Sequence, residues 1–262
     1  MKERFFTRGW CHLPYDETLA RWVEQVRPAA RAAVAAADNA AWLRCGGTWF
    51  VGVNALPNDS RGAVAGGTPI AGTAIDFIRR DLGMTGFGWD RGQVSVVYPG
   101  YPQPEEGESP AAFRFRREHA AAHVDGILHE GPDRRRHLRM YHEFILGIPM
   151  VTVESGISPL VVWEGSHEIV REAFRNFFRD TSPALWPERD VTALYRSVRR
   201  TIFDSCERTE VVARQGEAYL LHRLTLHGIA PWRDSAGPGP DARMIVYFRP
   251  DTGTPESWLN AP

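Results

Sequence analysis

The stretch AYLLHRLTLHG, residues 218–228, decides the fold class of this chain. Aliphatic, aromatic and threonine side chains fill it, and a glycine ends it, as is typical of a β-strand. Similar short runs recur after residue 92: QVSVVYPG (93–100), AAFRFRRE (111–118), EFILGIPMVTVE (143–154), SPLVVWEG (158–165), TEVVARQG (209–216) and RMIVYFRP (243–250). The second part of the chain is therefore predicted to be mainly β.

Helical spacing dominates the first part of the chain and interrupts the second. Asp16 is predicted to cap a helix in which Leu19, Trp22, Val23 and Val26 share one face, and Pro28 is expected to break that helix or to start another. Residues 48–53 are predicted to form a strand and 73–83 a short helix. Two further helices are expected in 167–180, capped by Ser166, and in 189–207.

Seven or so strands with one helical insertion favour a sandwich or jelly roll over a βαβ array. We expect a mainly β fold: a double-stranded β-helix (jelly-roll, cupin-like) core, with N-terminal and inserted helices packed on one face. One domain is predicted over residues 1–262, with a mostly helical part at 1–90 and the jelly-roll core at 91–250. The tail from residue 250 is expected to be irregular.

Composition excludes several classes of function. The formal net charge of −1 gives no general attraction to nucleic acid or to an acidic membrane surface. No apolar run reaches the roughly 18 residues of a membrane span. Cys11, Cys45 and Cys206 form no CxxC pair, which favours free thiols in a reducing cytoplasm. The expected partner is a small-molecule substrate, and the oligomeric state is left open.

The segment HVDG, residues 123–126, carries the first candidate site. Residues two apart in a strand point to the same side, so His123 and Asp125 would present an imidazole and a carboxylate together. Gly126 allows the backbone to turn away directly afterwards. Two histidines and one carboxylate form a face that suits Fe(II) and leaves coordination positions open. One more histidine is therefore needed.

Two downstream histidines compete for that role. His222 and His227 are separated by an odd number of positions, so on one regular strand they would face opposite sides. His227 precedes a glycine at the end of its strand, where ligands are commonly placed. His227 is therefore the predicted ligand, and His222 a wall or core residue.

These motifs, in order, resemble the phytanoyl-CoA dioxygenase family of Fe(II)/2-oxoglutarate-dependent oxygenases. HVDG is followed by a strand, then by WEGSH (163–167) before a helix, then by LHGIAP (226–231), and the likeness covers roughly residues 90–250. Glu164 and Trp232 depart from the family, which often has proline and asparagine there. The resemblance implies Fe(II) held by His123, Asp125 and His227, with 2-oxoglutarate and O₂ as cosubstrates. It also implies hydroxylation of a C–H bond coupled to decarboxylation of 2-oxoglutarate to succinate.

The resemblance further implies an arginine that binds the far carboxylate of 2-oxoglutarate. Arg243 opens a predicted strand, and a guanidinium grips a carboxylate with two parallel hydrogen bonds. Arg249 has the same strand parity, and Arg233 lies in the preceding loop, so both remain alternatives. The gap between His227 and Arg243 is longer than is usual in the family, which predicts a loop insertion in RDSAGPGPDA (233–242).

Other readings of the same residues stay open. A cupin-like protein could bind a small molecule without turnover, and His119 with His123 could hold zinc in a hydrolase if HAAAH were helical. The arginines of residues 134–139 are expected in a solvated loop, with an anionic clamp as the alternative. Tyr98, Tyr101, Trp163 and Trp232 are predicted to line the substrate pocket.

Overall fold

A computed structural model of the chain describes residues 1–233, 241–251 and 253–262. The strands are β1 (Trp10–Leu13), β2 (Leu43–Arg44), β3 (Trp49–Phe50), β4 (Gln93–Val97), β5 (Ile127–Glu130), β6 (Arg135–Leu138), β7 (Phe144–Pro149), β8 (Leu160–Trp163), β9 (Arg208–Val211), β10 (Ala218–His222), β11 (His227–Ile229) and β12 (Arg243–Phe248). The α-helices are α1 (Lys2–Arg8), α2 (Glu17–Ala35), α3 (Thr73–Asp76), α4 (Pro110–Glu118), α5 (Ser166–Phe178), α6 (Thr192–Ser205) and α7 (Pro255–Asn260). Shorter turns of 3₁₀ or π type are Ala37–Trp42, Phe77–Asp81 and Pro183–Glu188.

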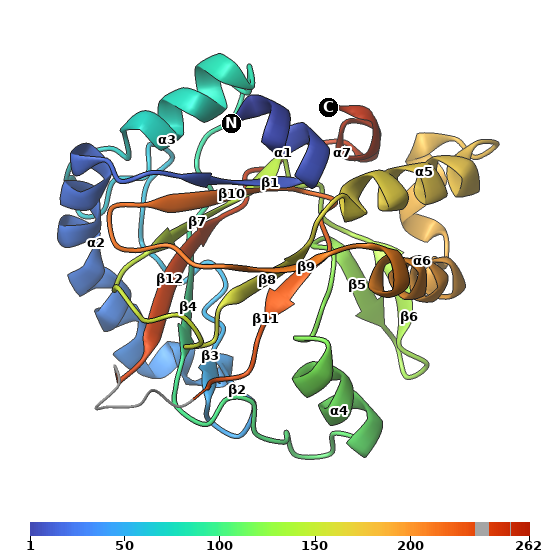
Figure 1. Cartoon of the computed structure of the whole chain (residues 1–262), viewed down its shortest axis with the longest axis horizontal. Helices are drawn as coiled ribbons and strands as arrows, with labels where there is room; N and C mark the ends of the chain where they lie inside the picture. Colours follow the sequence, from blue (N-terminus) through green and yellow to red (C-terminus); the bar gives the residue numbers. More distant parts are fainter. Residues whose placement is uncertain (234–240, 252) are drawn as a thin grey trace.

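Two antiparallel sheets form the jelly-roll core (Figure 1). The large sheet has the order β1-β10-β7-β12-β4-β3-β2, and the small sheet has the order β11-β8-β9. Except for β2 and β3, neighbours in both sheets come from distant parts of the sequence, as a jelly roll requires. The inward side chains of both sheets form one apolar layer, which contains Ile145 of β7, Val162 of β8 and Ile245 of β12. The predicted fold class is confirmed.

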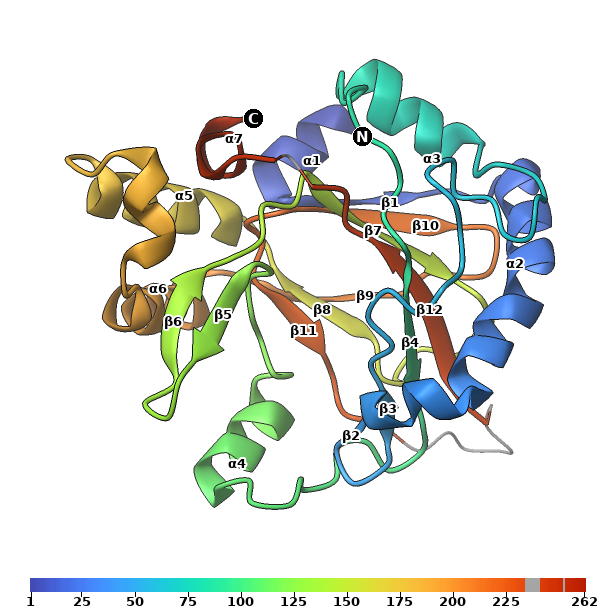
Figure 2. The same cartoon turned by 180° about the vertical axis from the view of Figure 1, so that it is seen from behind.

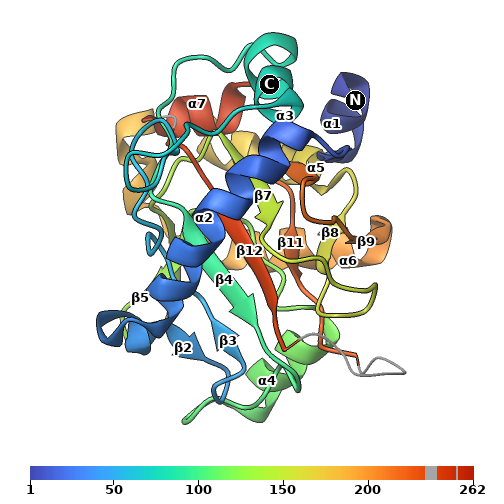
Figure 3. The ribbon, with the colours of Figure 1, turned by 90° about the vertical axis from the view of Figure 1, so that its left-hand side faces the viewer.

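Helices cover the core at two separate places. α2 crosses the outer face of the large sheet (Figure 3), where Trp22 and Val26 pack with Val246 and Phe248 of β12. α5, α6 and α7 instead build a second apolar core beside the small sheet, around Phe174 and Tyr195. The inserted helices thus lie away from the N-terminal ones, and β1 to β3 of the first ninety residues belong to the large sheet.

The helix α2 runs through Pro28 instead of ending there. Its N-cap is Asp16, whose Oδ1 accepts a hydrogen bond from the Leu19 N–H at 2.9 Å, as predicted. Pro28 is on the exposed face, so the carbonyl that loses its helical partner can bond to water. The buried face on the other side outweighs the local cost of the proline.

Four local predictions need correction. Residues 111–118 form α4 instead of a strand, because Ser109 caps the helix and Pro110 occupies its first turn. The supposed loop after the HVDG segment is the hairpin β5–β6, and the tail holds α7 instead of irregular chain. Gly165, not Ser166, is the N-cap of α5, since the Ser166 hydroxyl accepts from the Leu226 N–H at 2.9 Å. The predicted loop insertion falls mainly on 234–240, outside the described residues.

None of the helices in the described parts of the chain is both long enough and apolar enough to cross a membrane.

Arg223 fastens α7 to the core. Its side chain is fully buried and donates hydrogen bonds to the carbonyl oxygens of Trp258, Ser257, Ala261 and Pro262 at the end of the chain, and of Glu143. A buried guanidinium that satisfies so many carbonyls replaces the water they would otherwise bind.

The Arg223→Met variant is expected to lose about 3 kcal/mol of unfolding free energy, because several buried carbonyls are left without donors. Urea denaturation measures this loss. Arg208→Met is the matched control, since Arg208 is paired at the surface and should change stability by no more than about 0.5 kcal/mol. Equal stability of the two variants would show that Arg223 does not fasten α7.

Candidate metal centre

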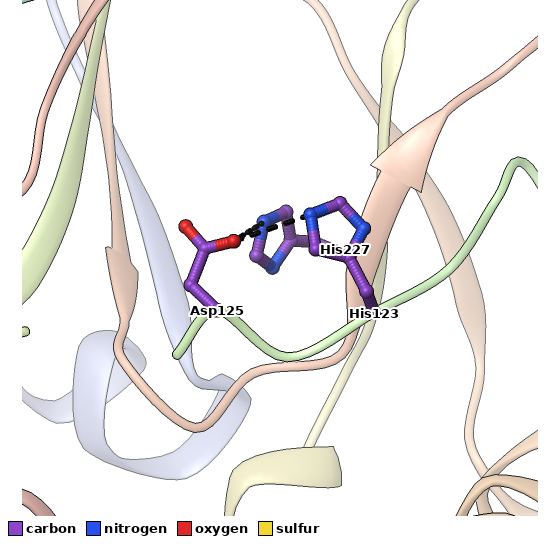
Figure 4. Close-up of side chains that lie close together, drawn as sticks. All are labelled: His123, Asp125 and His227. Carbon is purple, nitrogen blue, oxygen red and sulfur yellow. Dashed lines mark ion pairs between the residues drawn. The ribbon is translucent and has the colours of Figure 1, made fainter. Parts of the chain in front are cut away.

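Three side chains converge at one end of the small sheet (Figure 4). The His123 Nε2 lies 3.2 Å from the Asp125 Oδ1, and the His227 Nε2 lies 3.8 Å from the same oxygen. One ligand atom from each of the three residues lies within 4.8 Å of the others. Backbone bonds between His123 and His227, at 2.8 and 3.0 Å, fasten the HVDG segment to β11 and so fix the spacing. The sequence reasoning named these three residues, and the fold brings them together.

The backbone selects the tautomer of both histidines. The His123 Nδ1 lies 3.0 Å from the Ala121 carbonyl oxygen, and the His227 Nδ1 lies 2.9 Å from the Thr225 carbonyl oxygen. Only an N–H can bond to a carbonyl, so each Nδ1 carries a proton and each Nε2 is the ring nitrogen left to face a cation. Ala121 has a φ of 52°, a left-handed conformation that turns its carbonyl to His123 at a cost of about 1–2 kcal/mol.

Two glycines allow the approach of the segments that carry the ligands. A Cβ on Gly228 would lie 2.1 Å from the Ala120 carbonyl oxygen, so β11 could not pack this closely on the chain before His123. A Cβ on Gly126 would lie 2.2 Å from the Met140 carbonyl oxygen, and its φ is 86°. The turn predicted at Gly126 therefore serves close packing as well as chain reversal.

At neutral pH, Asp125 is charged and His227 is neutral, which are the states that bind a cation. Burial alone would raise the pKa of Asp125, yet the nearby Arg249, with the two histidines, holds it well below its ordinary value. Burial lowers the pKa of His227 to about 4. The centre therefore presents one carboxylate and a neutral imidazole on β11, the forms that ligate metal ions.

A cavity of about 150 Å³ opens beside the three side chains, between the two sheets. Its wall is mainly apolar. The lining residues are Trp49, Val51, Val53, Gln93, Ser95, His123, Asp125, Ile145, Leu160, Leu221, His227, Gly228, Ile229, Tyr247 and Arg249. Such a site can enclose a small organic ligand next to a metal ion.

The predicted pocket aromatics lie elsewhere. Tyr98 packs against the outer core of the large sheet, and Trp163 lies in the second core, 5.2 Å from Phe203 between ring centroids. Tyr101 and Trp232 form a separate small cluster with Trp49 and Ile229. None of these four predicted residues lines the cavity.

The aromatic side chains that do line the cavity are Trp49 and Tyr247. Trp49, Val51 and Val53 alternate in the predicted strand 48–53, and this period of two was the signal that could have identified one wall.

The three candidate arginines have different surroundings. Arg243 is 3% exposed at the start of β12, and its Nη2 lies 3.4 Å and 3.5 Å from the hydroxyls of Tyr219 and Tyr247. Its buried Nη1 has no hydrogen-bond partner within the described ranges. Arg233 pairs with Glu210 at the surface, and Arg249 pairs with Asp125. Of the three, only Arg243 has a buried nitrogen that lacks any hydrogen-bond partner among the described residues.

The tyrosine pair beside Arg243 depends on a glycine. β7 lies between β10 and β12, and its Gly147 is paired with Tyr219 on β10 and with Tyr247 on β12. A Cβ on Gly147 would lie 2.1 Å from the Tyr219 ring, so its absence lets that ring lie across β7. The two hydroxyls then bond at 2.9 Å. Burial holds the pKa of Tyr219 well above its ordinary value, so this hydroxyl stays protonated.

The zinc interpretation of HAAAH is not supported by the geometry. α4 ends at Glu118, so His119 and His123 do not share a helix, and the His119 ring stacks on Phe203 at 4.5 Å. In the described part of the chain, the one group of three or more His, Cys, Asp or Glu side chains close enough to share a cation is His123, Asp125 and His227.

The arginine-rich segment is the β5–β6 hairpin, seen from behind in Figure 2. Arg135 and Arg139 pair there with Asp190 and Glu130.

His222 lies away from the centre, in a buried polar group. It is on β10 of the large sheet, whereas His227 is on β11 of the small sheet, so the parity argument compared residues of two strands. The His222 ring lies 4.9 Å from the His167 ring, and its Nε2 lies 2.8 Å from Arg171 Nη2. Burial, then the charge of Arg223, holds the pKa of His222 well below its ordinary value, and burial lowers the pKa of His167.

The metal-free protein is expected to lose about 4 kcal/mol of stability between pH 7 and pH 5. His222 and His227 stay neutral when folded across this range but bind protons below about pH 6.5 when unfolded, so acid favours the unfolded state by about 2 kcal/mol for each. Urea unfolding across this range measures the slope. A His222→Gln variant should show a shallower slope, and the exposed His12→Gln control an unchanged one. An unchanged slope in His222→Gln would contradict this account.

The fold and these side chains define a jelly-roll protein with a candidate centre of two histidines and one carboxylate. Among solved structures, EctD from S. alaskensis with bound Fe has a TM-score of 0.50 and 16% identity, over 95% of this chain and 75% of that one. EctD with 2-oxoglutarate and 5-hydroxyectoine has a TM-score of 0.49 and 16% identity, over 95% of this chain and 74% of that one. The α-ketoglutarate-dependent carbocyclase SnoK from nogalamycin biosynthesis has a TM-score of 0.47 and 13% identity, over 95% of this chain and 82% of that one.

The likeness to iron-bound EctD shows a shared fold. No protein-family model matches this chain. No curated protein matches it either.

Proposed function

We propose that this chain is an Fe(II)- and 2-oxoglutarate-dependent oxygenase that hydroxylates a C–H bond of a small organic substrate. The observation that carries the proposal is the convergence of the His123 Nε2, the Asp125 Oδ1 and the His227 Nε2 at the edge of an apolar cavity. The jelly-roll fold shared with iron-bound EctD supports it. Strands from both halves of the chain share the large sheet, so we propose that residues 1–262 act as one domain.

The donor set fits Fe(II). Two neutral imidazoles and one carboxylate on one side of a cation leave the opposite positions open for a chelating cosubstrate and O₂. His123, Asp125 and His227 would hold the metal. The bound metal, with 2-oxoglutarate and O₂, would supply decarboxylation of the keto acid to succinate coupled to hydroxylation.

The far carboxylate of 2-oxoglutarate fits Arg243. A buried guanidinium with an unpartnered Nη1 needs an acceptor, and a carboxylate supplies one. The Tyr247 hydroxyl lies 3.5 Å from the Arg243 Nη2. Tyr247 also lines the cavity that reaches the metal centre. Arg243 would bind the anion, while the apolar wall around Ile145 and Leu221 would keep water away from the reacting atoms.

The test is oxygen-dependent formation of succinate from 2-oxoglutarate by anaerobically purified protein reconstituted with Fe(II). Turnover with Fe(II) but not with Zn(II) is expected. A cupin-like binding protein would take up a ligand without forming succinate, and a zinc hydrolase would be active with Zn(II). Either of these results would end the oxygenase proposal.

A further inference from the structure

Asp125 divides its two carboxylate oxygens between different partners. Oδ1 is the oxygen near both imidazoles, 3.2 Å from the His123 Nε2. Oδ2 lies 3.1 Å from the Nη1 of Arg249, which donates a hydrogen bond to it. The side chains of Asp125 and Arg249 are 8% and 17% exposed, so water competes little for this ion pair. The arginine was weighed from the sequence only as a ligand for 2-oxoglutarate, and this contact was not foreseen.

Arg249 is held in place independently of Asp125. Its Nη2 donates to the Gln93 Oε1, and the Gln93 Nε2 donates in turn to the Val51 carbonyl at 2.8 Å. The backbone N–H of Arg249 donates to Asp90 Oδ1 at 2.8 Å. A guanidinium fixed by neighbouring strands can impose an orientation on the carboxylate it touches.

We propose that Arg249 is a positioning residue that reserves Oδ2 of Asp125, so that the carboxylate binds a metal through Oδ1 alone. This inference rests on the proposed function of the centre. A free carboxylate can bind a metal with one oxygen or with both, and the second oxygen takes a position. Three positions must stay open for a two-point cosubstrate and O₂. The hydrogen bond from Arg249 to Oδ2 would keep the third coordination position open.

Arg249 does not suit direct binding of the cosubstrate. Both of its terminal nitrogens are engaged, one by Asp125 and one by Gln93. Arg243, at the start of β12, has a buried Nη1 with no hydrogen-bond partner among the described residues, whereas Arg249 directly follows the end of that strand. The arginines at the start of β12 and just after its end are thus assigned different roles, and the experiment must separate positioning from anion binding.

Water-proton relaxation of the Mn(II)-loaded protein makes that separation, because it counts metal-bound waters without 2-oxoglutarate and without turnover. In Arg249→Met the relaxation enhancement is expected to fall by roughly one third, as one of three water positions is lost to Oδ2. Affinity for 2-oxoglutarate should then fall about tenfold, while Mn(II) affinity stays within about threefold of wild type. Arg233→Met, which breaks an Arg–carboxylate pair outside the centre, should change none of these values.

Arg249→Lys keeps the charge and should recover most of the relaxation, since an ammonium can still occupy Oδ2. Unchanged relaxation in Arg249→Met with weaker 2-oxoglutarate binding would mean that Arg249 binds the anion, and the inference would fall. Equal losses of Mn(II) and 2-oxoglutarate affinity in both variants would show a merely structural role and overturn it too. Failure of the wild type to bind Mn(II) would instead reject the metal centre itself.

Discussion

Asp125→Ala is expected to reduce Fe(II)-dependent succinate formation by about a thousandfold or more, since a metal centre supplies several kcal/mol of catalysis. Asp125 is the one anionic ligand of the proposed set, and Arg249 keeps its pKa low enough for a full negative charge at neutral pH. Without it, two neutral imidazoles face a dication beside an unpaired guanidinium. Metal affinity, measured by titration with Mn(II), should fall together with turnover.

The controls for this variant separate chemistry from folding. Asp125→Asn keeps the shape and a hydrogen-bond acceptor for Arg249 but not the charge, so it should fold and still lose most metal affinity. Asp133→Ala, in the exposed turn of the β5–β6 hairpin, should behave as wild type. Full activity in folded Asp125→Ala would show that the metal lies elsewhere.

Arg243→Gln should raise the KM for 2-oxoglutarate about a hundredfold, with a much smaller change in kcat. A charge-assisted bidentate contact in a buried site is worth about 3 kcal/mol, and it acts on a part of the cosubstrate that does not react. Steady-state kinetics with 2-oxoglutarate varied at saturating Fe(II) gives both constants. Glutamine fills similar space and can still meet the tyrosine hydroxyls, which limits the disturbance of the fold.

Arg196→Gln provides the matched control, because Arg196 is exposed on α6 and does not line the cavity. It should leave both constants within about twofold of wild type, as surface substitutions usually do. If Arg243→Gln also left the KM unchanged while lowering stability, Arg243 would be a core residue and the anion would bind elsewhere.

Strands that are buried on both faces could be predicted from the sequence, because each is a short, nearly continuous apolar run next to proline or glycine. β7, β8 and β12 fall inside their predicted runs for this reason. The β5–β6 hairpin was missed because each strand has only one buried residue, so no apolar run or alternation marks them. Helix α4 was misassigned because none of its residues is buried, and its cap at Ser109 was the better signal.

The candidate site, too, could be predicted only in part from the sequence. His123 and Asp125 are neighbours in sequence, so their pairing is a local property of one segment. His227 was named through strand parity, although β10 and β11 are separate strands in different sheets. The cavity wall comes from long-range pairing, which places Trp49 and Tyr247 inside and sends Trp163 into another core. Such pairings depend on the whole fold.

Gly147 has a consequence for the keto-acid site proposed here. Because no side chain rises from that position, the Tyr219 phenol lies flat across the strand and meets Tyr247 beside the buried guanidinium. An added methyl group would force the phenol ring to move, and with it the hydroxyl that contacts Tyr247 and Arg243. Under the proposed function, the position of the guanidinium that would bind the far carboxylate thus depends on an atom that is missing, at a position that no ligand needs to touch.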